Sequence, residues 1–246
     1  MTDLTPDGTI RIAMWSGPRN ISTAMMRAWE NRADTAVTDE PFYAAYLAAT
    51  GLEHPMRAEV IAAQSTAWQE CARFCAGGVE APVHFQKHMC QHMIGAAPLG
   101  WMAACRHAFL IRPPEAVAAS FHERWAGMGA DDLGFRRQAE LFDHVCQTEG
   151  HAPPVLEARD VLEAPEAMLR ALSSALGMGF DPAMLAWPVG PRDSDGVWAA
   201  HWYARVNAST RFAPYSAPGP VLEGLTGIVE ECRPYYERMR AHKLKV

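Results

Sequence analysis

The order of apolar and polar positions along the chain predicts strands that alternate with helices. Short apolar runs rich in β-branched and aromatic residues indicate buried strands, and longer stretches of helix formers with apolar residues every three or four positions indicate helices. We interpret as strands residues 9–15, 35–38, 83–86, 107–111 and 154–158. We interpret as helices residues 22–29, 57–76, 113–125, 132–149, 165–176 and 221–241.

This alternation predicts an α/β fold with a mostly parallel central sheet and helices on both faces. Ligands of such sheets bind beyond the carboxyl ends of the strands. The chemistry is therefore expected just after Trp15, Thr38, Gln86 and Ile111. We find no internal repeat and no linker, so residues 1–246 are expected to form one domain.

Composition and charge narrow the choice of partners. The net charge of −6 argues against a nucleic-acid partner, but a pocket on an acidic protein can still be locally positive. No apolar run has transmembrane length, and the start of the chain lacks the basic and apolar regions of a leader, so no membrane partner is expected. The six cysteines show no metal-binding spacing, which favours reduced thiols in a cytoplasmic protein. The oligomeric state is left open, a homodimer included.

The loop after the first predicted strand has the features of a phosphate site. Residues 16–25 join a strand to a helix, and the N–H groups at a helix N-terminus attract anions. Ser22 and Thr23 add hydroxyl donors, and Arg19 adds a permanent positive charge. The loop is not a Walker A motif, because it has no Lys and lacks the required glycine spacing. A tight turn followed by a capped helix is the alternative interpretation.

A second pair of anion-binding groups follows the strand at 107–111. Arg112 stands at its carboxyl end, and Ser120 lies about two turns into the next helix. A guanidinium fork and a hydroxyl are suitable donors for a phosphate dianion. The alternative interpretation is that Arg112 forms an ordinary ion pair and that Ser120 is an ordinary helical serine.

Together the two loops resemble the sulfotransferases that use 3′-phosphoadenosine-5′-phosphosulfate (PAPS). The stretch Pro-Arg-Asn-Ile-Ser-Thr-Ala-Met at 18–25 is similar to their 5′-phosphosulfate loop, with Ile21 where the family usually has Gly. Arg112 and Ser120 have the spacing of the family's 3′-phosphate ligands. The resemblance implies a P-loop-type three-layer sandwich. It also implies that PAPS, without a metal, contacts Arg19, Asn20, Ile21, Ser22, Thr23, Arg112 and Ser120.

The resemblance also suggests residues for the transfer step. Lys87 and His88 resemble the family's Lys-Thr-His motif, whose His is the base, but lack the intervening residue; His84 and His92 are rivals of His88. Some bacterial members use a Glu near Glu40 instead, and Glu40 could also cap a turn. We favour His88 because the ordinary pKa of histidine suits neutral pH, but leave the base open between His88 and Glu40.

A later region completes the resemblance. Residues 181–220 are rich in Gly, Pro and Trp, and they resemble the family segment that closes over the cofactor, with Arg192 as the phosphate contact. The implied reaction moves a sulfuryl group from PAPS to a hydroxyl or amine of a small molecule, with Arg19 and Lys87 assisting. Two alternatives remain: a P-loop kinase or other phosphotransferase, and a non-catalytic nucleotide-binding protein derived from a sulfotransferase.

Overall fold

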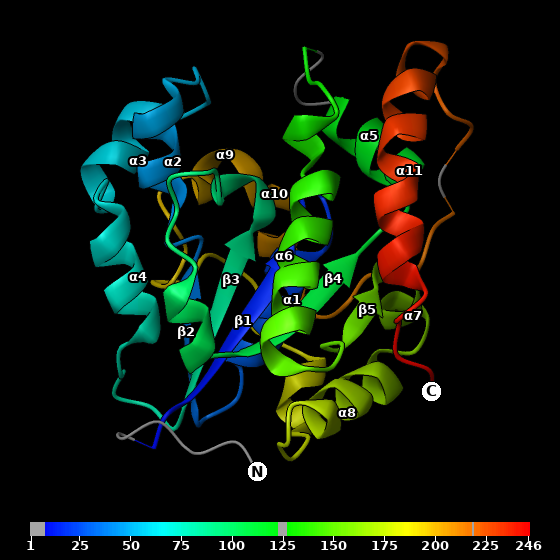
Figure 1. The fold of residues 1–246 in the computed structure, drawn as a ribbon. Helices are drawn as coiled ribbons and strands as arrows, with labels where there is room; N and C mark the ends of the chain where they lie inside the picture. Colours follow the sequence, from blue (N-terminus) through cyan, green and yellow to red (C-terminus); the bar gives the residue numbers. More distant parts are fainter. Residues whose placement is uncertain (1–7, 123–126, 218) are drawn as a thin grey trace.

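A parallel sheet forms the centre of the molecule (Figure 1). The computed structural model describes residues 8–122, 127–217 and 219–246. The strands are β1 (Ile10–Ser16), β2 (Thr35–Asp39), β3 (Val83–Met89), β4 (Arg106–Ile111) and β5 (Val155–Glu157). They pair in the order β2-β3-β1-β4-β5, with every pairing parallel. The predicted α/β fold is confirmed.

Helices cover both faces of this sheet. They are α1 (Ser22–Glu30), α2 (Tyr43–Thr50), α3 (Arg57–Ala63), α4 (Trp68–Ala76), α5 (Pro114–His122), α6 (Phe135–Glu149), α7 (Ala158–Glu163), α8 (Pro165–Ala175), α9 (Ala199–Trp202), α10 (Ala204–Asn207) and α11 (Thr226–Arg240). Side chains of β1 alternate between two cores: Trp15 belongs to the core with α4, α5, α6 and α11, and Met14 to the core with α1 and α8. Within the described part of the chain, no helix is long and apolar enough to cross a membrane.

One predicted helix is two helices in the structure. The stretch 57–76 breaks at Gln64, whose backbone is extended, and α4 begins after a turn in which the Ser65 hydroxyl accepts a hydrogen bond from the N–H of Ala67. The Gln64 side chain donates to the carbonyl oxygens of Asp39 and Glu40 and accepts from the N–H of Ala44. The break therefore positions the Gln64 side-chain amide to bind the backbone at the end of β2.

Other boundaries differ for local reasons. Residues 43–50, not predicted as an element, form α2. Gly134, with φ 73°, separates a short 3₁₀ turn from α6 and so divides the predicted stretch 132–149. The helix after Pro113 is described through His122, so its predicted end near Trp125 lies outside the described residues. The region 181–220 contains the short helices α9 and α10, which the sequence pattern did not indicate.

A buried histidine network lies on the Trp15 side of the sheet. His84 shares hydrogen bonds with Thr38 (2.8 Å) and Gln86 (3.2 Å), and His107 accepts one from the Trp15 indole (3.0 Å). Burial lowers the pKa of both imidazoles, from the ordinary 6.5 to about 4. Both rings are therefore neutral at pH 7, and their protonation favours the unfolded chain.

We expect acid to destabilise the protein through this network. Because the folded-state pKa values lie below 6.5, the unfolded chain binds more protons, and stability falls as the pH drops from about 6.5 towards 4. The melting temperature at pH 5 should be roughly 10 °C below that at pH 7. In His107→Gln, whose amide oxygen can still accept from Trp15, the decline should be shallower. An equal decline in this variant would show that other groups cause the acid sensitivity.

Candidate functional site

A cavity of about 480 Å³ lies at the carboxyl edge of the sheet. Its described lining includes residues 18–24 after β1, Glu40 after β2, Met89 at the end of β3, Arg112 after β4 and Arg159 after β5. This is the edge at which the parallel strands were expected to place the chemistry.

The loop after β1 has a demanding backbone. A side chain at Gly17 would place a Cβ 2.6 Å from the carbonyl oxygen of Leu133, so only glycine fits there. Arg19 and Ile21 both adopt left-handed conformations, with φ of 59° and 56°. A non-glycine residue at such a φ carries strain, which structures retain mostly at functional sites. Ile21 thus adopts the backbone that the glycine of similar loops would adopt freely.

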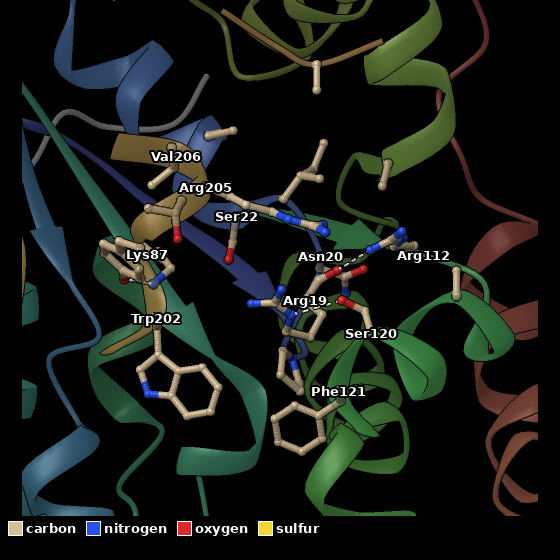
Figure 2. Close-up of a pocket in the computed structure, with 18 of the residues that line it drawn as sticks. Arg19, Asn20, Ser22, Lys87, Arg112, Ser120, Phe121, Trp202, Arg205 and Val206 are labelled. Carbon is tan, nitrogen blue, oxygen red and sulfur yellow. Dashed lines mark hydrogen bonds between the residues drawn. The ribbon is translucent and has the colours of Figure 1, made fainter. Parts of the chain in front are cut away.

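Hydrogen bonds join the two predicted phosphate loops. The Arg19 Nε donates to the Ser120 hydroxyl at 3.0 Å, and the Arg112 guanidinium donates to the Arg19 carbonyl oxygen at 2.8 Å (Figure 2). The Asn20 amide donates to the Leu110 carbonyl oxygen at 3.1 Å and fixes the loop against β4. Residues predicted from separate motifs, about 100 positions apart in the chain, therefore meet in one cavity.

The cavity is strongly basic although the chain is acidic. Its described lining carries one carboxylate, Glu40, and these basic side chains: Arg19, Lys87, Arg112, Arg159, Arg205 and Arg211. Figure 2 shows Arg205 near Ser22. Converging guanidinium groups and the N-terminus of α1 form an environment suited to a multiply charged anion.

Lys87 is the centre of a buried cluster next to this basic region. Its Nζ donates to Asp39 (2.7 Å), Glu40 (2.5 Å) and the Tyr203 hydroxyl (2.6 Å). Burial alone would lower the pKa of Lys87, but the two carboxylates raise it well above its ordinary value. Lys87 is therefore a fixed cation. It lies on β3 and is held by Asp39 at the end of β2, by Glu40, and by Tyr203, the residue directly after α9.

Glu40 has the features of an acid–base group. Its backbone is left-handed, with φ 44°, and its side chain is buried at the cavity wall. Burial raises the pKa of this carboxyl to about 7, with Lys87 opposing the shift. A carboxyl with a pKa near the working pH can accept a proton and release it again.

The structure does not bring His88 to the described cavity wall. Side chains alternate along β3, so Lys87 faces the cavity and His88 lies on the opposite face of the sheet. There the His88 ring stacks on the Trp15 ring, with 4.5 Å between the ring centroids, and its centroid lies 5.0 Å from that of Trp101. His88 also shares a hydrogen bond with Gln86. Burial lowers its pKa well below the ordinary range.

Arg192 also lies outside the described cavity wall. Its guanidinium donates to the Pro188 carbonyl oxygen at 2.9 Å and approaches Glu30 at the end of α1 at 3.7 Å. The segment 181–220 nevertheless contributes to the cavity, through Arg205 and Arg211. Residues of this late segment therefore line the cavity, whereas Arg192 does not.

Several lining residues were not among the predicted site residues. They are Tyr43, His54, His92, Arg159, Trp198, Trp202, Tyr203, Arg205, Arg211 and Tyr215. Most lie on short helices or loops without apolar periodicity, where the sequence pattern carries no signal for their direction. His92 was named beforehand, as a rival of His88.

Comparisons with known proteins identify the family of this chain. The family model described as "Sulfotransferase domain" matches residues 10–243. The "Branched-chain-amino-acid aminotransferase-like protein 1" of Arabidopsis thaliana is 33% identical over 233 residues, which are 94% of this chain and 42% of that protein. The chain therefore spans less than half the length of this relative.

Two solved structures share the fold at low sequence identity. The sulfotransferase domain of the Synechococcus PCC 7002 olefin synthase has a TM-score of 0.50 at 14% identity, with both chains fully covered. A sulfotransferase from Alicyclobacillus acidocaldarius has a TM-score of 0.53 at 10% identity, covering 96% of this chain and 97% of that one. With the family match over nearly the whole chain, the conclusion is that this protein belongs to the sulfotransferase domain family.

Proposed function

We propose that the protein transfers a sulfuryl group from PAPS to a hydroxyl or amine of a small molecule. The observation that carries this proposal is the meeting of Arg19, Arg112 and Ser120 in one basic cavity. Two anion-binding loops at opposite ends of one nucleotide are more specific than either alone. Arg205 and Arg211 add positive charge for a ligand with phosphate at both ends.

The residues of the cavity suggest a division of labour in the transfer. The acceptor oxygen or nitrogen attacks sulfur, the bond between sulfur and the phosphate oxygen breaks, and its electron pair stays on that oxygen. Arg19 and the N–H groups that begin α1 would stabilise the growing negative charge. Lys87 lies beside Glu40, and Glu40 would take the acceptor's proton. His88, the other predicted base, lies on the opposite face of the sheet.

Calorimetry with adenosine 3′,5′-bisphosphate tests the donor site directly. We expect binding without Mg²⁺ and with higher affinity than ATP, because the two loops match the two phosphates of this nucleotide. Transfer from PAPS to acceptors is then measured with the same preparation. Equal or tighter binding of Mg-ATP would favour a phosphotransferase, and nucleotide binding without any transfer would favour a non-catalytic protein.

Arg112→Ala should weaken binding of adenosine 3′,5′-bisphosphate by roughly 1.5–3 kcal/mol, the usual contribution of a charged hydrogen bond. Part of this loss comes from the loop itself, because Arg112 also holds the Arg19 carbonyl oxygen. Ser120→Ala should cost less, because a neutral hydroxyl contributes less than a guanidinium. Both affinities are measured by calorimetry.

The exposed pair Arg136–Asp131 offers a matched control. Arg136→Ala removes an exposed guanidinium that is not part of the described cavity wall and should leave nucleotide affinity unchanged. If folded Arg112→Ala binds the nucleotide as tightly as the wild type, Arg112 does not contact a phosphate.

A further inference from the structure

The cavity lining contains two chemically different groups of side chains, and Figure 2 shows Arg112 of the first group on the opposite side from Trp202 of the second. One, the arginine end, is formed by Arg19, Arg112, Arg159, Arg205 and Arg211. The other, the ring end, is formed by Tyr43, His54, His92, Trp198, Trp202 and Tyr203. If the donor's phosphates occupy the arginine end, as the proposed function requires, the acceptor must enter from the ring end, and its chemistry should match that end.

Contacts between the side chains define the ring end as one structure. Tyr43 forms a hydrogen bond with His54. Its ring stacks on that of His92, with 4.5 Å between the centroids, and meets the Trp198 ring edge-on at a centroid distance of 5.1 Å. His54 also stacks on Trp202 at 5.6 Å. These contacts cover one face of several of the rings, so the acceptor meets an aromatic wall whose remaining faces carry partial negative charge.

The ring end carries no uncompensated positive charge among its described residues. Lys87, the one cation among the described lining residues here, is held by the carboxylates of Asp39 and Glu40. Burial lowers the pKa of His54 and of His92, so both imidazoles are neutral at pH 7. The Asp132 carboxylate, on the turn before α6, acts electrostatically on the ring end and opposes the lowering of the His54 pKa.

We infer that the acceptor is a hydroxyl compound that carries a protonated amino group and no carboxylate or phosphate. An ammonium group is attracted by the π systems of Tyr and Trp rings and by the Glu40 carboxylate at the cavity wall. Its positive charge would in turn favour the ionised form of Glu40. An anionic acceptor would meet carboxylates and ring faces, and the described ring end offers it no uncompensated cation. The inference rests on the proposed function and specifies its acceptor class.

Matched acceptor series test this inference on the wild-type protein with PAPS. The aromatic series is tyramine, 4-hydroxyphenethyl alcohol and 4-hydroxyphenylacetate; the aliphatic series is ethanolamine, ethylene glycol and glycolate. Within a series that is accepted, we expect kcat/KM for the amine to exceed that for the acid by at least about tenfold, with the neutral compound between them. Equal values, or a preference for the acid, overturn the inference while leaving sulfuryl transfer established. If the protein transfers to other acceptors but to none of the six compounds, the inference is overturned and the proposed function stands; without transfer to any acceptor, the proposed function is overturned as well.

Two neighbouring aspartates provide a variant and its control. Asp132→Asn removes the carboxylate near the ring end, so kcat/KM for the amine should fall about two- to fivefold, with the neutral acceptor unchanged. Asp131→Asn removes the adjacent exposed carboxylate, which pairs with Arg136, and should change neither value. If the amine and the neutral compound lose rate equally in Asp132→Asn, the effect is structural, and Asp132 has no electrostatic part in acceptor choice.

Discussion

Arg19→Ala is expected to lower both nucleotide affinity and turnover, the latter by roughly 10²- to 10³-fold. The Arg19 guanidinium lies in the anion loop and donates to Ser120, where it would meet charge already present on the bound donor. That charge increases as the S–O bond breaks, so the interaction strengthens in the transition state. Calorimetry with adenosine 3′,5′-bisphosphate gives the first effect, and the rate of sulfuryl transfer from PAPS gives the second.

Arg19→Lys separates charge from geometry. A lysine keeps the positive charge but cannot reproduce a guanidinium that donates to Ser120 and to a phosphate together. We therefore expect partial recovery of affinity and less recovery of turnover. If Arg19→Ala transfers at the wild-type rate under saturating PAPS, the leaving phosphate is stabilised elsewhere, and the proposed role of the loop is wrong.

Glu40→Gln is expected to lower turnover by roughly 10²- to 10⁴-fold, the usual range for a positioned base. The amide keeps the size of the side chain and its contact with Lys87 but cannot take a proton. Nucleotide affinity should be unchanged, because Glu40 faces the Lys87 cluster and the ring end. Turnover is measured with an acceptor already shown to be sulfated by the wild type, and affinity by calorimetry.

The pH dependence gives an independent measure of the same group. Burial raises the pKa of Glu40 to about 7, and a base works only when deprotonated, so the wild-type rate should rise as the pH increases from 6 to 8. In Glu40→Gln the residual rate should lose this rise. His88→Gln serves as the comparison, since it changes a histidine on the other face of the sheet. An unchanged rate in Glu40→Gln, with loss in folded His88→Gln, would restore His88 as the base.

The sheet and its binding edge were predictable from local pattern alone. Each strand is a short apolar run between turn residues, and parallel order follows from the intervening helices, so the carboxyl ends of the strands were expected at one edge. The strand order that makes β1 and β4 neighbours was not predicted. The positions of Arg19, Arg112 and Ser120 followed from that edge and from the resemblance. Lys87 was also predicted as a site residue. Of its two carboxylate partners, Glu40 was a predicted site residue and Asp39 was not.

The remaining site residues depend on contacts that the sequence does not encode locally. Lys87 and His88 are adjacent in the chain but lie on opposite faces of β3, and only the register of the strand decides which one faces the cavity. The late segment contains three arginines, Arg192, Arg205 and Arg211. Because the segment has no apolar periodicity, the sequence pattern cannot tell which of them faces the cavity. Their directions follow from tertiary contacts such as the buried ion pair of Arg27 with Asp195, at 2.6 Å.

That ion pair has a thermodynamic consequence. It fastens the segment 190–212 to α1, and the same segment supplies Arg205 to the arginine end and Trp198 and Tyr203 to the ring end. Ligands at the two ends would therefore contact one and the same segment, through which their binding can be coupled. Binding linkage is reciprocal, so the factor by which nucleotide tightens acceptor binding must equal the factor by which acceptor tightens nucleotide binding.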